Sequence, residues 1–430
     1  MKITVFAMSL LAAGFAFAAN DAGYSVSRVS ALQRWPWDNK VDIRFWLDQG
    51  TAKNAIWYGA EVDVSVTVGG VTTPIASSSL DKTTVYGEGQ HTLVWTPTAE
   101  FPARVLEGAS FAVTIREAPV AAAYLTVDLT TGERAAYGAG FASAVTNGVD
   151  YKSTKMAFRY CPPTTSDAWK AISGGKDYFV IGQPANGDGG QRPGTDDVRE
   201  TPANIRLTHG FYLGVFPVTI DQWQRLGFSG GKSETKPTHD PAKTNGPYMA
   251  ACGLAYEKIR GADGPNSPYC FPASRTVDPA SYLGVLRART GCDFDLPTEA
   301  QFEYACRAGT TTTFYGDYNT YFVPGAGHRR DVGSFPANPW GFYDMVCALH
   351  QWTTTLAKDA SGNNLLHVAG DDPEGISPTW SNTSRIIKGG HIQADWNCVY
   401  RSAYRMGQAT AGETASELVH DGFRLCLTCP

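Results

Sequence analysis

An alternation of apolar and polar residues with a period of two is the strongest constraint on the fold of this 430-residue chain. Between about residues 24 and 118, every second residue is apolar in several runs, and glycine-containing turns separate the runs. This period is typical of strands with one buried and one solvated face. We therefore expect an all-β sandwich of immunoglobulin-like type over residues 24–118. Examples are Val41 to Leu47, Val62 to Val68 and Phe111 to Ile115.

Residues 1–18 have the form of a secretory signal peptide. Lys2 gives a positive charge, an apolar run follows from Ile3 to Phe17, and residues 16–18 form a small-x-small cleavage pattern. The run is shorter than the roughly 20 residues of a spanning helix, although a short membrane anchor is the alternative. We expect an exported protein (periplasmic, cell-surface or secreted) without a membrane span.

The cysteine count and the net charge limit the disulfide chemistry and the binding partners that we expect of this chain. The chain has nine cysteines, and all of them follow residue 18. Disulfides persist outside the cytoplasm, so we expect some, but an odd number leaves at least one thiol free, intermolecularly paired or functional. A formal net charge of −5 gives no electrostatic footprint for nucleic acid, so we expect no nucleic-acid partner.

The residue composition and the secondary-structure signals change along the rest of the chain. Residues 119–175 are expected to bridge two domains, and residues 176–430 combine glycine- and proline-rich loops with a few helix signals. Capping boxes at Thr219 and Thr298 predict helices over about 219–226 and 298–307. A third helix is expected over 281–289 with Gly291 as its stop. The region is therefore predicted to be α+β and rich in irregular loops.

Short motifs follow one another in this region in a recognisable order. The first lies near residue 179 and the last near the C-terminus. They are Phe179-Val180-Ile181-Gly182, Gly210-Phe211-Tyr212-Leu213-Gly214, Leu296-Pro297-Thr298-Glu299-Ala300-Gln301-Phe302-Glu303-Tyr304-Ala305, Gly341-Phe342-Tyr343-Asp344-Met345, Lys388-Gly389-Gly390, Arg401-Ser402-Ala403-Tyr404-Arg405 and Gly422-Phe423-Arg424-Leu425.

These motifs and their order resemble the formylglycine-generating enzyme family, also called the sulfatase-modifying factor family, over about residues 176–430. The resemblance implies a fold related to C-type lectins. It also implies a copper-dependent oxidase that converts cysteine to formylglycine in a sulfatase-type polypeptide. Membership of a family does not by itself establish activity, because function depends on the site.

The resemblance places a pair of Cu(I)-binding cysteines between Gly390 and Arg401. Two soft thiolates suit Cu(I), but this interval contains only Cys398, and Asn397 stands where the second thiol is expected. His391 replaces the family's serine. Cys398 and His391 are the candidate catalytic residues and could form a mixed site. The alternative is that Cys398 is structural or disulfide-bonded.

The family's Ca2+ ligands are also only partly matched. The usual asparagine and glutamate are replaced by Ala348 and Gln351, so we expect this oxygen site to be lost or weakened. Cys347 stands where the family has glycine, and a Cys347–Cys398 disulfide is one hypothesis.

Three further residues are candidates for substrate binding. Arg401 and Arg405 could bind an anionic or carbonyl ligand through their guanidinium groups, and the alternative is that they brace loops. Trp352 is either a substrate contact or a core residue. Glu303 is expected to pair with a nearby cation.

Three functions follow from these observations. The first is a formylglycine-generating-like enzyme acting on a sulfatase-like polypeptide. The second is a non-catalytic protein that binds a peptide or a glycan on a lectin-like scaffold. The third is a non-haem iron oxygenase of the ergothioneine-synthesis kind, but no helical, histidine-bearing domain is readable in the sequence.

Overall fold

A computed structural model divides the chain into two compact units. One comprises Met1–Tyr124 with Ala135–Gly140, and the other Leu125–Arg134 with Phe141–Pro430. The predicted bridging segment contributes mainly to the second unit. The structure describes residues 23–34, 38–50, 55, 57–97, 101, 106–183, 200–231, 246–316, 330–380, 383–390, 400–410 and 420–429.

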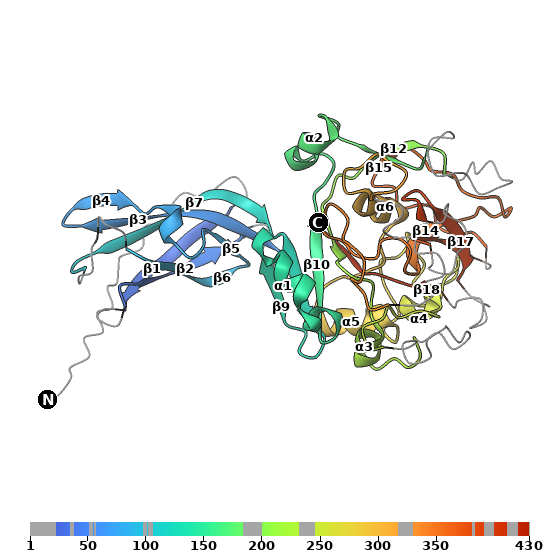
Figure 1. Cartoon of the computed structure of the whole chain (residues 1–430), viewed down its shortest axis with the longest axis horizontal. Helices are drawn as coiled ribbons and strands as arrows, with labels where there is room; N and C mark the ends of the chain where they lie inside the picture. The colour runs from blue at the N-terminus through green and yellow to red at the C-terminus, as the bar shows by residue number, and fades with distance from the viewer. Residues whose placement is uncertain are drawn as a thin grey trace. The chain divides into compact units, whose positions relative to one another are not determined.

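The first unit contains two antiparallel sheets (Figure 1). One has the order β1-β2-β6; the other has the order β4-β3-β5, with β7 also paired to β3. Apolar residues from both sheets form one core, and the predicted alternation is confirmed at β2, where Val41, Ile43, Phe45 and Leu47 are all buried. The immunoglobulin-like topology stays a prediction. The strands are β1 (Ser25–Gln33), β2 (Val41–Asp48), β3 (Tyr58–Val68), β4 (Val71–Pro74), β5 (Thr84–Tyr86), β6 (Gly89–Trp95) and β7 (Ser110–Ala121).

The second unit is built from short strands, short helices and long loops. Strands β19, β13, β10 and β8 are neighbours in that order, and two further sheets have the orders β11-β12-β15 and β17-β16-β14-β18. The strands are β8 (Tyr124–Asp128), β10 (Lys155–Cys161), β11 (Phe179–Ile181), β12 (Ala203–Arg206), β13 (Phe211–Gly214), β14 (His350–Leu356), β15 (Gly370–Asp371), β16 (Ser384–Lys388), β17 (Arg405–Ala409), β18 (Asp421–Gly422) and β19 (Cys426–Thr428). Strand β9 (Arg134–Tyr137) falls mostly within the first unit. The helices are α1 (Ala142–Asn147), α2 (Asp167–Ser173), α3 (Ile220–Arg225), α4 (Tyr256–Ile259), α5 (Tyr282–Thr290) and α6 (Glu299–Arg307).

The three predicted helices are present, and the two predicted capping boxes and the stop at Gly291 are confirmed. Thr219 and Thr298 form complete capping boxes at α3 and α6. Ser281 caps α5, and Gly291 ends it in the left-handed conformation. Helices α1, α2 and α4 were not predicted because each has at most seven residues and little apolar periodicity.

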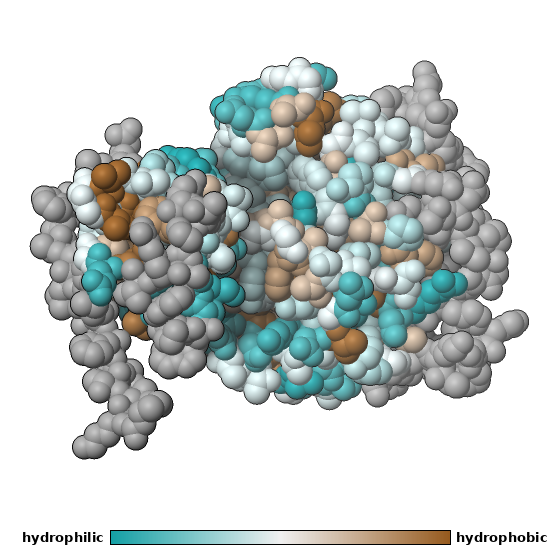
Figure 2. Space-filling view, turned by 60° about the vertical axis from the view of Figure 1, so that its left-hand side comes forward, coloured by the Kyte–Doolittle hydropathy of each residue, from teal (hydrophilic) through white to brown (hydrophobic). Residues whose placement is uncertain are grey.

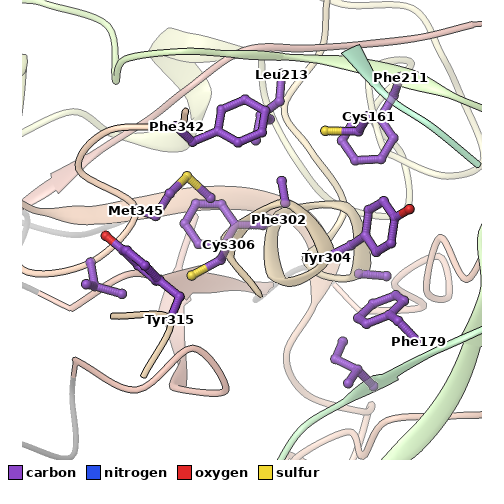
Figure 3. Packing of buried hydrophobic residues seen from close by; sticks show 14 of the residues in the cluster. Cys161, Phe179, Phe211, Leu213, Phe302, Tyr304, Cys306, Tyr315, Phe342 and Met345 are labelled. Carbon is purple, nitrogen blue, oxygen red and sulfur yellow. The ribbon is translucent and has the colours of Figure 1, made fainter. Parts of the chain in front are cut away.

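Helix α6 is the centre of the second unit. All nine of its residues are buried, and it packs against β11, β14 and β16. Figure 3 shows Tyr304 and Phe179 on one side of the helix, with Cys306, Met345 and Tyr315 on the other. A helix enclosed on every side must also bury its polar residues, which then need partners.

The described part of the chain has few large hydrophobic side chains that are exposed. Among the residues that the structure describes, no helix has the length and apolar character that crossing a bilayer requires. On the face in Figure 2, the coloured hydrophobic residues are scattered among polar ones. Single exposed apolar residues are normal, so a binding site is better sought in a groove than in a patch.

Candidate functional site

The buried carboxylates of α6 form a dense ionic network. Lys388, on β16, donates from Nζ to Oε2 of Glu303 at 2.8 Å, and Arg307 donates to the other oxygen of Glu303 at 2.9 Å. Arg405, on β17, donates to Glu299 at 2.7 Å. The predicted pairing of Glu303 with a cation is therefore confirmed.

Electrostatics keep both carboxylates ionised. Burial alone would raise the pKa of Glu299, but Arg405, His367 and Lys388 outweigh it and hold that pKa below the usual range. Burial acts in the same way on Glu303, and Lys388 and Arg307 lower the pKa of that carboxyl below its usual value. The network therefore stabilises the fold at neutral pH.

The same network includes three groups with the donor types of a metal site. One ligand atom from each of Glu299, Glu303 and His367 lies within 4.8 Å of the others. However, Lys388 lies within 4.0 Å of both carboxylates, and Arg307 and Arg405 bind them as well. The negative charge is already balanced, so the arrangement is an ion-pair network rather than a metal centre.

The predicted substrate-binding residues are engaged in internal contacts. Arg401 is buried and donates to Glu200 at 2.8 Å, and Arg405 is committed to Glu299 and to the carbonyl of Leu365. Trp352 is fully buried and donates from Nε1 to a backbone carbonyl at 2.9 Å. These contacts agree with bracing and core roles. The candidate catalytic residues His391 and Cys398, with Asn397, lie outside the described residues.

The calcium positions of the family do not fit Ca2+ in this chain. Ala348 has no oxygen in its side chain. Gln351 donates to the carbonyl of Asp344 at 3.0 Å and accepts from Arg424 at 2.8 Å, so both ends of its amide are used. Arg424 also donates to Gly214 O at 2.6 Å, and burial lowers its pKa to about 10. A guanidinium bound by oxygens is therefore the cation at this place.

Asp344 and Cys347 adopt unusual backbone conformations beside this guanidinium. Asp344 has φ of 55° and accepts from the amide of Gly333 at 2.7 Å, as a loop-bracing carboxylate would. Burial raises its pKa to about 6. Cys347 has φ of 69°, a left-handed conformation that glycine adopts without strain. A position with this backbone conformation favours glycine, which is the residue that the family has there.

The sulfur atoms near α6 are buried thiols. Burial raises the pKa of Cys306 to about 11, and burial together with Cys306 raises the pKa of Cys347 as well. A thiol that stays protonated is a poor nucleophile and a poor metal ligand. Cys306 and Cys347 are also at most 1% exposed, so neither sulfur faces a surface from which it could meet a substrate.

We expected some disulfides, but the structure shows six of the described cysteines as free thiols. The free buried thiols are Cys161, Cys270, Cys292, Cys306, Cys347 and Cys426. The hypothesis of a Cys347–Cys398 bond falls partly outside the described residues.

A groove of about 690 Å³ lies beside β19 and α5. This volume is within the roughly 300–1,000 Å³ of ligand sites. Its apolar lining includes Leu207, Phe271, Val277, Pro279 and Leu296, and its polar lining includes Thr298, Gln301 and Thr428. No sequence signal could have located it, because its walls come from segments scattered between Leu207 and Thr428.

The charged residues of the groove are paired with one another. His209 lies 3.3 Å from Asp372, and Arg287 lies 3.2 Å from Asp295. Arg275 pairs with Glu374. With histidine counted as neutral, the lining carries two arginines against the four carboxylates of Asp293, Asp295, Asp372 and Glu374, so the groove favours a ligand without excess negative charge.

Comparisons with known proteins agree with the motif pattern. A formylglycine-generating enzyme of Mycobacterium tuberculosis is 34% identical over 160 residues, which are 31% of this chain and 51% of that protein. The serine/threonine-protein kinase pkn1 of Chlamydia caviae is 24% identical over 222 residues, 49% of this chain and 33% of the kinase. The chain therefore spans about half or less of the length of these relatives.

A solved structure, PvdO from Pseudomonas aeruginosa, has a TM-score of 0.41 and 18% identity, covering 64% of this chain and 94% of that chain. The sequence model of the sulfatase-modifying factor enzyme 1-like domain matches residues 171–429, which is more than half of the chain. The predicted resemblance is thereby confirmed, and the chain belongs to the sulfatase-modifying factor enzyme 1-like family.

Proposed function

We propose that this protein is an exported family member whose second unit binds a partner polypeptide, such as a sulfatase, without oxidising a cysteine in it. The sequence supports export through residues 1–18. The family relationship supports a polypeptide partner, because relatives carry the name formylglycine-generating enzyme. Binding without oxidation requires that the copper chemistry is lost.

The state of the sulfur atoms carries this proposal. The interval from Gly390 to Arg401 has a single cysteine, and Asn397 stands at the second thiol position. Two thiols beside α6, Cys306 and Cys347, are buried, and burial raises their pKa values. The sequence thus offers no second cysteine in this interval for a two-sulfur Cu(I) site, which supports binding without the oxygen chemistry of the family.

The experiment separates binding from oxidation. The full chain is incubated with Cu(I), O2 and a Cys-x-Pro-x-Arg peptide, and the peptide mass is followed. We expect no change in mass, together with saturable binding of the fluorescein-labelled Ser-x-Pro-x-Arg analogue and weaker binding of a scrambled control. Conversion of the thiol to an aldehyde, abolished by Cys398→Ser, would overturn the proposal in favour of the enzyme. Binding of an oligosaccharide and of neither peptide would favour the glycan alternative.

A further inference from the structure

The hydrogen bonds of β19 alternate between its two edges. Gly214 donates to the carbonyl of Leu425 at 2.9 Å, and Cys429 donates to the carbonyl of Gly210 at 2.9 Å. Leu427, between them, is opposite Tyr212 on β13. In an antiparallel pair, the backbone groups of every second residue point toward the neighbouring strand. Cys426 and Thr428 therefore direct their N–H and C=O groups away from β13.

The outward groups of Cys426 are satisfied within the protein. Cys426 donates to the carbonyl of Asp295 at 2.7 Å and accepts from the amide of Asp295 at 2.8 Å. This short pairing stops after one residue, because the amide of Phe294 bonds back to the carbonyl of Cys292 at 2.9 Å and turns the chain. The partner strand ends just before it would reach Thr428.

Thr428 is consequently an open position on the edge of a sheet. Strand β19 is at the end of its sheet, and Thr428 is exposed and lines the groove. Within the described part of the chain, its backbone N–H and C=O have no partner, while its hydroxyl accepts from Gln301 at 2.9 Å. An unpaired edge position is a template for another strand.

We propose that an extended segment of the partner polypeptide adds to β19 at Thr428 and lies in the groove. The backbone of the segment pairs with the N–H and C=O of Thr428, continuing the line begun by Asp295. Side chains on one face of the segment contact Leu207, Val277 and Leu296. This mode is strand addition, in which main-chain hydrogen bonds give affinity and side-chain pockets give specificity.

The composition of the groove favours a peptide over other ligands. A peptide main chain offers the donor and acceptor pair that Thr428 lacks, in the spacing of a strand. The lining carries two arginines against four carboxylates, so it favours neutral or basic side chains, such as those of the Ser-x-Pro-x-Arg peptide. The inference rests on the proposed function, because it requires that the second unit binds a polypeptide.

A proline substitution tests the edge directly. Thr428→Pro removes the outward N–H, and proline is tolerated on an edge strand where the N–H faces solvent. Thr428→Ala is the matched control, because it also loses the Gln301 hydrogen bond but keeps the N–H. We expect Thr428→Pro to bind the labelled Ser-x-Pro-x-Arg peptide at least about tenfold more weakly than Thr428→Ala does.

The peptide supplies a second test that requires no mutation. Methylating its backbone nitrogens one at a time should weaken binding to the wild-type chain at alternate positions only, because alternate amides face β19. Melting temperatures and far-UV circular dichroism check that the variants are folded. If Thr428→Pro unfolds the protein, the methylated peptides decide the matter.

The outcomes separate the two proposals. Equal affinity of Thr428→Pro and Thr428→Ala, or uniform tolerance of N-methylation, would overturn strand addition and leave polypeptide binding standing. Failure of the wild-type chain to bind the peptide would overturn polypeptide binding, and strand addition with it. Alternating N-methyl sensitivity together with the loss in Thr428→Pro would support strand addition at this edge.

Discussion

Replacing Lys388 with methionine removes one cation from the buried network at α6 while nearly keeping the side chain's length. Lys388 donates to Glu303 at 2.8 Å and lies 3.7 Å from Glu299, and the side chains of all three residues are at most 4% exposed. The substitution leaves Glu303 with Arg307 and with the amide of Gly182, which donates at 2.7 Å. The negative charge of Glu303 thus stays partly compensated by Arg307 and the Gly182 amide.

Removal of one partner from a buried ion pair costs roughly 3–5 kcal/mol, because the other charge stays buried. We place the loss of unfolding free energy for Lys388→Met at the lower end, about 3 kcal/mol, because of the remaining contacts of Glu303. Arg225→Met is the control. Arg225 donates to Asp221 at 2.9 Å on the surface of α3, where such a pair contributes at most about 1 kcal/mol.

Denaturant unfolding of the full chain at several pH values measures both effects. In the wild type the pKa of Glu303 is lowered from its model-compound value of 4.5, so its contribution is present above that pH and is lost as pH falls. In Lys388→Met, protonation of Glu303 removes the orphan charge. The deficit of the variant should therefore shrink as pH falls below about 4.5. A deficit under about 1 kcal/mol at pH 7, or one independent of pH, would refute the reasoning.

The geometry of the site predicts two further effects, one of substitutions at Cys347 and one of added Ca2+. Cys347→Gly should be about 1 kcal/mol more stable than Cys347→Ala in denaturant unfolding, because only glycine relieves the positive φ of 69° once the sulfur is gone. Equal or reversed stabilities would show that the backbone there is unstrained. Millimolar Ca2+ or a chelator should leave the melting temperature unchanged, because Ala348 and Gln351 provide no site and linkage requires binding to the native state. A melting temperature that rises with Ca2+ would contradict this.

Local signals in the sequence were sufficient for the main helices. Thr298 and Gln301 are three residues apart, and their reciprocal capping could be predicted without any tertiary contact. Likewise, the alternation in β2 predicted its buried face. A cation beside Glu303 could also be predicted, because a carboxylate that becomes buried in a protein needs a partner.

Long-range contacts set the limit of what could be predicted. Lys388 is 85 residues from Glu303 in sequence, and nothing local to either residue names the other. The groove was missed for the same reason, because its walls and the open edge at Thr428 exist only after β19 has paired with β13. The roles proposed for Cys398 and His391 stay predictions.

The free thiols of the second unit place a condition on how this protein folds. Among the described residues, buried cysteines such as Cys161 and Cys306 are free thiols. In a chain that folds after export, each of these thiols is exposed to oxidants until the core closes around it. Wrong disulfides are therefore avoided only if packing around α6 is faster than thiol oxidation. Speed of core formation, rather than oxidative cross-linking, would then decide the yield of the native protein.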